Sequence, residues 1–196
     1  MYGGEWLKSC YTMIIGITGT FCAGKGTIVE YLQKKGFVHY SVRGYINKEI
    51  ERRGLPITRD NMVLVANDLR AKNSPSFIVE EIYKEAAKSD KNCIIESIRT
   101  PGEAIALKNK DRFYLFAVDA ERKKRYSRSQ VRNDSHSDNV SFEKFCLQED
   151  MEMSSTDPNK QNVSKVMSMA DFHFENDGTL DELHQKIDMV LDKISG

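Results

Sequence analysis

Short apolar runs alternate with amphipathic stretches along the chain. Apolar runs bounded by polar residues or glycine are typical of buried strands, whereas apolar residues at helical spacing are typical of helices. We therefore expect five strands, one that begins at Ile14 and ends at a glycine-bounded loop, and four others at residues 37–40, 92–97, 112–119 and 170–175. We expect helices at residues 27–36, 45–53, 61–72, 76–88, 103–108, 120–132, 142–153 and 179–194.

This alternation predicts the fold class. Strands that alternate with helices form mostly parallel sheets covered by helices on both faces. The expected fold is α/β, a three-layer αβα sandwich with a five-stranded, mostly parallel sheet. Residues 1–12 are an expected N-terminal extension, and residues 13–196 are an expected single domain. The polar segments 133–140 and 154–162 are expected to belong to a helical lid at approximately residues 122–162.

The most informative stretch follows the first strand. The spacing G-x-x-x-x-G-K runs from Gly19 to Lys25, between an isoleucine-rich strand and a helix, which is the order that a phosphate-binding loop requires. Glycines let the backbone turn its N–H groups toward a phosphate. The helix N-terminus adds unpaired donors, and Lys25 adds a mobile charge. The expected nucleotide-binding residues of the loop are Gly19, Thr20, Phe21, Cys22, Ala23, Gly24, Lys25, Gly26 and Thr27.

Two residues are candidates for a magnesium site. Gly26 stands where Ser or Thr usually follows the loop lysine, so the nearest hydroxyl belongs to Thr27. Glu96 ends an apolar run, as an acid does at the end of a Walker B strand. We expect Glu96 to hold Mg²⁺ through water or to orient the acceptor hydroxyl. A helix-capping or exposed glutamate is the alternative.

Three arginines are candidates for binding the phosphate acceptor. Transfer between two anions needs cations near the acceptor, and the planar arginine fork pairs with two phosphate oxygens. Arg43 follows the second expected strand, Arg70 lies in a helix, and Arg99 follows the third expected strand. A solvated surface charge is the alternative for each. Arg99 is the strongest candidate, because ligands gather at the carboxyl ends of parallel strands.

A basic cluster spans residues 122–132. On a helix, Arg125, Arg128 and Arg132 share one face, where like charges repel unless an anion lies between them. This favours a lid over the phosphates, with an exposed helix face or a nucleic-acid patch as alternatives. Arg128 and Arg132 therefore join Lys25, Glu96 and Arg99 as candidate catalytic residues. Beyond the fifth strand, Asn176 and Gly178 are expected to line the base pocket, with a plain turn as the alternative.

Composition narrows the possible partners and location. Lys+Arg and Asp+Glu both number 29, so the net charge is zero and gives no general reason to expect nucleic acid. The cysteines lack C-x-x-C spacing, which indicates a reduced protein without structural zinc. No apolar run reaches membrane-spanning length, and the N-terminus lacks a signal-peptide pattern. We expect a cytoplasmic protein, a monomer or weak dimer, without nucleic-acid or membrane partners.

The stretch from Met13 to Ile194 resembles the P-loop nucleoside/nucleotide kinase superfamily. The resemblance covers adenylate-kinase-like and dephospho-CoA-kinase-like proteins, and P-loop domains attached to deoxycytidylate deaminases. It rests on the loop ending G-K-G-T, on Ile-Ile-Glu-Ser-Ile-Arg at 94–99, on Arg-x-x-x-Arg at 128–132, and on Ala170-Asp171-Phe172 running into Asn176-Asp177-Gly178.

The resemblance implies ATP with Mg²⁺ as donor. It also implies that Lys25 holds the donor phosphates, that Arg128 and Arg132 belong to the lid, and that Arg70 and Arg99 face the acceptor. After strand two, related chains often have Gly-Asp and then an arginine, whereas this chain has Arg43, Gly44 and Asn47.

Several functions remain open from the sequence. The first is transfer of the ATP γ-phosphate to a nucleoside monophosphate or similar small nucleotide. The second is dephospho-CoA kinase, for which Leu55, Pro56 and Ile57 would supply an apolar groove. The third, motivated by Gly44 and Asn47, is a nucleotide-binding regulatory module that has a protein partner. A GTPase is less favoured, because the near match to N-K-x-D at 109–112 precedes a strand rather than following one.

Overall fold

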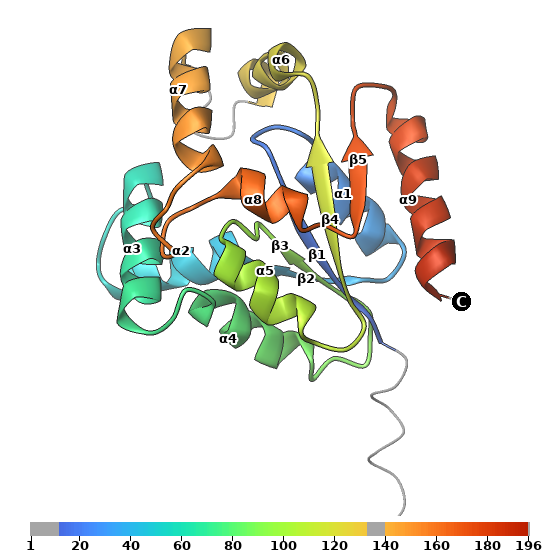
Figure 1. Cartoon of the computed structure of the whole chain (residues 1–196), viewed down its shortest axis with the longest axis horizontal. Helices are drawn as coiled ribbons and strands as arrows, with labels where there is room; N and C mark the ends of the chain where they lie inside the picture. The colour runs from blue at the N-terminus through green and yellow to red at the C-terminus, as the bar shows by residue number, and fades with distance from the viewer. Residues whose placement is uncertain (1–11, 133–139, 196) are drawn as a thin grey trace, which may run out of the picture.

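The computed structural model describes residues 12–132 and 140–195, and its centre is a five-stranded sheet (Figure 1). The strands lie in the order β2-β3-β1-β4-β5, and every neighbouring pair is parallel. This confirms the expected α/β class, with a sheet that is entirely parallel. The strands are β1 (Ile14–Gly19), β2 (Val38–Ser41), β3 (Cys93–Glu96), β4 (Phe113–Asp119) and β5 (Phe172–Glu175).

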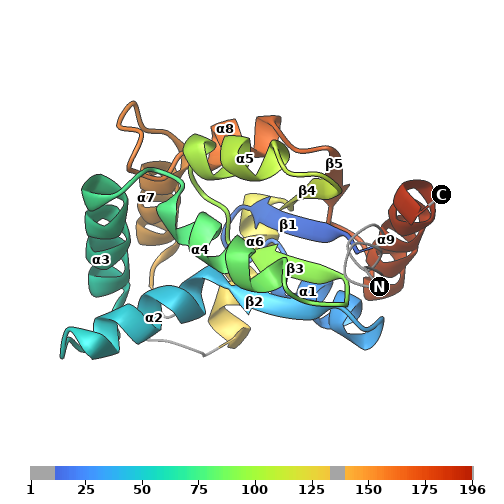
Figure 2. The same cartoon turned by 90° about the horizontal axis from the view of Figure 1, so that it is seen from below.

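Helices cover both faces of the sheet, which confirms the three-layer sandwich (Figure 2). One face carries α1 (Lys25–Lys34) and α9 (Leu180–Ser195). The other face carries α2 (Val42–Arg52), α4 (Phe77–Ala86), α5 (Pro101–Lys108) and α8 (Val163–Ser168), and α3 (Arg59–Lys72) packs beside α2. Two further helices, α6 (Arg122–Arg132) and α7 (Phe142–Met153), lie beyond the carboxyl ends of the strands (Figure 1).

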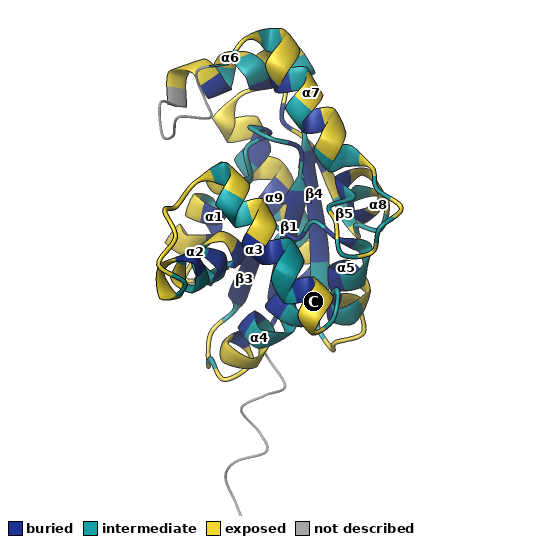
Figure 3. Ribbon diagram, turned by 90° about the vertical axis from the view of Figure 1, so that its left-hand side faces the viewer, coloured by how far each residue is buried: buried dark blue, intermediate teal, exposed yellow. Residues whose placement is uncertain are grey.

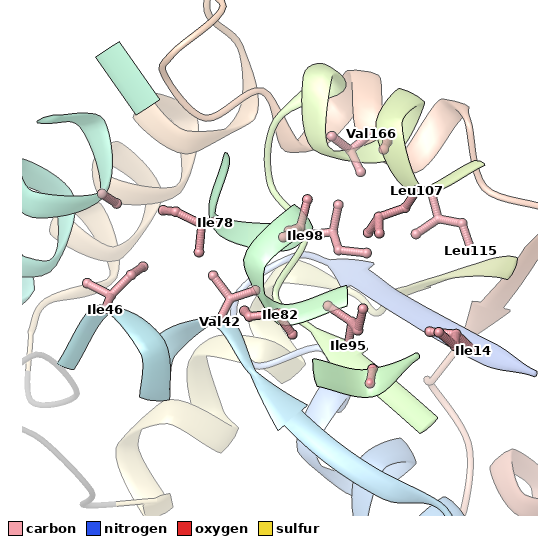
Figure 4. Packing of buried hydrophobic residues seen from close by; sticks show 14 of the residues in the cluster. Ile14, Val42, Ile46, Ile78, Ile82, Ile95, Ile98, Leu107, Leu115 and Val166 are labelled. Atoms are coloured by element: carbon pink, nitrogen blue, oxygen red, sulfur yellow. The ribbon is translucent and has the colours of Figure 1, made fainter. Parts of the chain in front are cut away.

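Alternation of side chains along β1 builds two separate cores. Ile15 and Ile17 pack toward α1 and α9, whereas Ile14 packs toward α4 and α5, as the two-residue period of a strand requires. Gly16 faces the second core, where an added Cβ would lie 2.4 Å from the ring of Phe113. The sheet and its helices therefore meet at van der Waals contact around β1 (Figure 4).

Capping residues explain why three helices begin earlier than their apolar patterns predict. The hydroxyl of Ser41 accepts from the Gly44 N–H and starts α2 at Val42 instead of Tyr45. Thr58 caps α3 in the same way. Thr100 and Glu103 form a reciprocal capping box with Pro101 at the first helical position, so α5 begins two residues earlier than expected. Side-chain capping, rather than hydrophobic periodicity, fixes these boundaries.

The short helix α8 was not predicted. It has six residues, of which only Val163 and Val166 are buried. A pattern this short gives too few positions to reveal a helical period. Over the part of the chain that the structure describes, none of the helices combines the length and the apolar composition needed to cross a bilayer.

Candidate functional site

The loop between β1 and α1 holds the central features of the site. Gly24 lies just before α1 with φ 111°, and an added Cβ would lie 2.3 Å from the amide nitrogen of Asn176. That amide donates to the Ala23 carbonyl at 2.8 Å. Only glycine combines this left-handed backbone with so close a neighbour. Asn176, expected to line a base pocket, therefore also fixes the shape of the loop.

Lys25 folds back onto the loop that precedes it. As the first residue of α1, it donates its ammonium group to the carbonyls of Gly19 at 2.9 Å and Thr20 at 2.7 Å. Burial, and then the positive charge of Arg99, lower the pKa of Lys25 from 10.5 to about 8. A nearby phosphate would favour the charged form, so Lys25 is poised for an anionic ligand.

Glu96 ends β3 beside the loop, as its place in the sequence predicts. Its carboxylate accepts from Ser97 at 3.2 Å and lies 3.5 Å from Nε2 of His39 on β2. Burial raises the pKa of Glu96, but His39 and Lys25 outweigh burial, and the pKa lies below its usual value. Glu96 is therefore ionised at neutral pH. His39, which the sequence gave no reason to single out, belongs to this cluster.

Arg99 meets one side chain of α7 and one of the loop before α8, just beyond β3. Its Nη1 atom donates to Glu152 of α7 at 2.7 Å and to Gln161 at 2.9 Å. The other oxygen of Glu152 accepts from Arg59 at the start of α3, at 2.5 Å. Figure 3 shows α3 and α7 on the same side of the molecule. One carboxylate thus joins two guanidinium groups.

The same cluster contacts the phosphate loop. The guanidinium of Arg59 lies 5.6 Å from the ring centroid of Phe21, within cation–π range. Burial raises the pKa of Glu152, but the charges of Arg99 and Arg59 outweigh burial and hold it below its usual value. Arg59 and Glu152 were both missed by sequence reasoning, because an arginine near a helix start and a glutamate in an acidic helix carry no distinguishing signal.

Arg70 has a different environment from the one expected. It is 3% exposed, and its guanidinium donates twice to Oε1 of Glu103, at 2.7 and 3.1 Å. The other oxygen of Glu103 accepts from the backbone N–H groups of Arg99 and Thr100. Arg70 therefore acts on the site indirectly, by fixing the carboxylate that holds the Arg99 backbone. We leave it out of the acceptor site proposed below.

Arg43 lies in the first turn of α2 and is exposed to solvent. Gly44 follows it and donates its N–H to the cap at Ser41. β2 therefore runs directly into α2, whereas the expected strand and helix were separated by residues 41–44. Arg43 remains a prediction as a substrate-binding residue.

The arginines of the basic helix α6 have different partners. Arg128 donates to the carbonyl of Asn176 at 2.7 Å, which places it next to the loop-fixing amide. Arg125, expected on the same face, is instead buried, paired with Glu149 of α7, and bonded to the Phe21 carbonyl at 3.3 Å. Glu149 and the Phe21 carbonyl therefore offset the charge of Arg125 and relieve its repulsion from the other arginines of α6. Arg132 ends α6, and its side chain lies outside the described residues.

The other expected nucleotide-binding residues surround the loop. Thr20 donates its hydroxyl to Asp119 at the end of β4, at 2.5 Å. Thr27 lies in the first turn of α1, next to the exposed Gly26. Gly178 precedes α9, where Thr179 and Glu182 form a capping box. Their contacts with a nucleotide remain predictions.

A parallel sheet, a glycine-bounded loop and a half-buried lysine at the carboxyl edge of the sheet together define a P-loop kinase-like protein. A family model described as an AAA domain matches residues 15–145, more than half of the chain, and the protein belongs to this family.

Relatives and solved structures extend over nearly the whole chain. A UPF0200 protein of Thermococcus sibiricus is 28% identical over 188 residues, covering 93% of this chain and 95% of the relative. The structure of shikimate kinase from Bacteroides thetaiotaomicron matches with a TM-score of 0.60 and 12% identity, covering 92% of this chain and 98% of that one. Dephospho-CoA kinase from Campylobacter jejuni matches with a TM-score of 0.52 and 15% identity, covering 95% and 99%. Structural matches at these identities show a shared fold.

The Arg70–Glu103 pair gives a first prediction. Replacing Arg70 with Met leaves an uncompensated carboxylate in the core, which should lower the free energy of unfolding by about 3–5 kcal/mol. Denaturant unfolding measures this loss. Arg52→Met is the control, because Arg52 pairs with Glu49 at the surface with 73% of its side chain exposed, where water screens the pair and its loss should leave stability nearly unchanged. An Arg70→Met protein of wild-type stability would refute the structural role assigned to Arg70.

Proposed function

We propose that this protein is an ATP-dependent phosphotransferase that moves the γ-phosphate to a nucleoside monophosphate or a similar small anionic acceptor. The supporting observation is the gathering of opposite charges at one edge of the sheet. The charges of Arg99, Glu96 and Glu152 all act on the pKa of Lys25. Lys25 lies near Arg99 and near the carboxylates of Glu96 and Glu152. Such a grouping of charges suits the transfer of a phosphate between two anions.

Each group has a task in the proposed reaction. The loop N–H groups and Lys25 hold the donor phosphates, and Arg99 holds the acceptor. An acceptor oxygen forms a bond to the γ-phosphorus while the bond from that phosphorus to the β–γ bridging oxygen breaks, and ADP leaves with the electron pair. The ionised Glu96 orients the acceptor hydroxyl and accepts its proton where the attacking group carries one. Positioning and charge stabilisation supply the rate.

The chemistry of the donor set fits Mg²⁺. This ion prefers oxygen ligands and keeps several waters, so it needs few protein groups. Thr27 offers a hydroxyl at the start of α1, and Glu96 offers an ionised carboxylate at the end of β3. These two residues would hold the ion, through water in the case of Glu96. When bound, Mg²⁺ neutralises charge on the donor phosphates.

A second candidate is dephospho-CoA kinase. The turn between α2 and α3 exposes Leu55 at 36% and Ile57 at 47%, an apolar surface suited to the pantetheine arm of such an acceptor. The third reading, a nucleotide-binding regulatory module, predicts ATP binding with negligible transfer.

The test is ADP release from Mg-ATP with CMP, dCMP, UMP, AMP, GMP, dTMP and dephospho-CoA as acceptors. We expect release with one acceptor and its loss in Lys25→Ala, because the loop then lacks the charge for the donor phosphates. Turnover of dephospho-CoA alone would select the second candidate. Measurable ATP binding without release in any mixture would contradict the proposed transfer and favour the regulatory module.

The lowered pKa of Lys25 predicts a pH dependence for ATP binding. Above about pH 8 the free protein holds a neutral amine, whereas a bound phosphate favours the ammonium form. Binding must then take up a proton, so ATP affinity should fall by about tenfold per pH unit above pH 8. Calorimetric titrations between pH 7 and 10 measure this slope. Lys25→Ala should bind weakly with no such slope, and a flat wild-type profile would refute the assignment.

A further inference from the structure

Glu152 occupies a position that suits an anionic ligand. It reaches from the last turn of α7 into the space between two arginines that come from other parts of the chain. One carboxylate oxygen accepts from Arg59 at 2.5 Å and the other from Arg99 at 2.7 Å. Guanidinium groups commonly bind the oxygens of phosphates and carboxylates in proteins. The two oxygens of Glu152 are shared between two such groups.

The charge of the surroundings explains why this space needs an anion. Arg59, Arg99 and Lys25 converge there, and Arg99 lowers the pKa of Lys25 through its charge. Glu96 compensates part of this positive charge and Glu152 compensates a smaller part, since both carboxylates raise the pKa of Lys25 and Glu96 raises it more. Without an anion between them, the guanidinium groups would repel each other in a partly dehydrated site. An incoming anion can therefore take the place of Glu152.

A neighbouring ion pair, between α6 and α7, is an example of a permanent bridge. Glu149 and Arg125 are 4% and 5% exposed in their side chains, and Arg125 also bonds to the Ala120 carbonyl. By contrast, the side chains of Glu152, Arg59 and Arg99 are 18%, 26% and 27% exposed. Solvent reaches the Glu152 cluster, so a small anion can enter and the carboxylate can leave.

We propose that the space between the Arg59 and Arg99 guanidinium groups binds a phosphate or carboxylate group of the acceptor, and that Glu152 is its internal competitor. This deepens the proposed function and rests on it where it speaks of the acceptor. Two consequences follow. An acceptor must carry an anionic group to displace Glu152, and its binding releases the end of α7 from α3 and from the loop after β3.

The test measures anion binding without turnover. Inorganic phosphate and, separately, acetate are titrated into the full-length wild type and Glu152→Gln, at fixed ionic strength and with calorimetric detection. Removing the competitor should tighten binding of the preferred anion on the order of tenfold. The phosphate and acetate arms show which chemistry the site prefers. Circular dichroism checks that each variant is folded.

Further variants assign the effect to this site. Asp150→Asn removes one carboxylate from the same helix, but Asp150 pairs with Arg122 instead, so anion affinity should stay within about twofold of wild type. Arg59→Gln combined with Glu152→Gln should abolish the gain. Because Arg59 also contacts the ring of Phe21 on the phosphate loop, Lys25→Ala combined with Glu152→Gln separates the two possible anion sites: the gain should persist in that variant and be lost only with Arg59→Gln. Should Glu152→Gln not fold, Glu152→Asp, which is too short to span both arginines, should show a smaller gain.

Equal or weaker binding of both anions by folded Glu152→Gln would overturn the proposal and make Glu152 a structural bridge. A gain that persists without Arg59 would also overturn it. Neither result depends on catalysis. A chain that transfers no phosphate can still show the exchange at Glu152, and an active kinase can lack it, so failure here is distinct from failure of the proposed function.

Discussion

The ammonium group of Lys25 is the constraint around which the site is organised. A cation on the first turn of a helix, at the helix's positive end, is unfavourable in a dehydrated environment. The loop carbonyls of Gly19 and Thr20 accept hydrogen bonds from this ammonium group. The carboxylates of Glu96 and Glu152 raise the pKa of Lys25 against the effect of burial. The charge of Lys25 thus couples the phosphate loop to the end of β3 and to the end of α7.

The parallel sheet explains why these groups meet. All five strands end at one edge, so residues far apart in the sequence, such as Lys25 and Glu96, become neighbours. Buried ion pairs then set the finer geometry. Arg125 and Glu149 tie α6 and α7 to the loop carbonyl of Phe21, and Glu103 fixes the backbone at Arg99. These structural pairs leave Arg59 and Arg99 available for a ligand that can displace Glu152.

The sequence predicts the fold better than it predicts the partners of individual charges. The apolar runs identified all five strands. The three inner strands β1, β3 and β4 are mostly buried, so their own residues mark them, and the edge strands β2 and β5 are only partly buried but still carry short apolar or alternating runs. The spacing from Gly19 to Lys25 identified the loop, because that motif is local. The environments of Arg70 and Arg125 were not predictable, because their partners Glu103 and Glu149 lie 33 and 24 positions away. Thr100-Pro101-Gly102-Glu103 did carry a local signal, since it matches a capping box that starts with proline.

In the proposed reaction, the γ-phosphate passes from the loop of Lys25 to an acceptor held by Arg99. Phosphorus NMR follows that phosphate directly in a mixture of Mg-ATP, an acceptor and the protein. We expect the γ-resonance of ATP to decline while a new phosphoryl resonance appears on the acceptor. An Arg99→Gln variant should still bind ATP but should not form this product. Release of inorganic phosphate alone, or equal product formation by Arg99→Gln, would contradict the account.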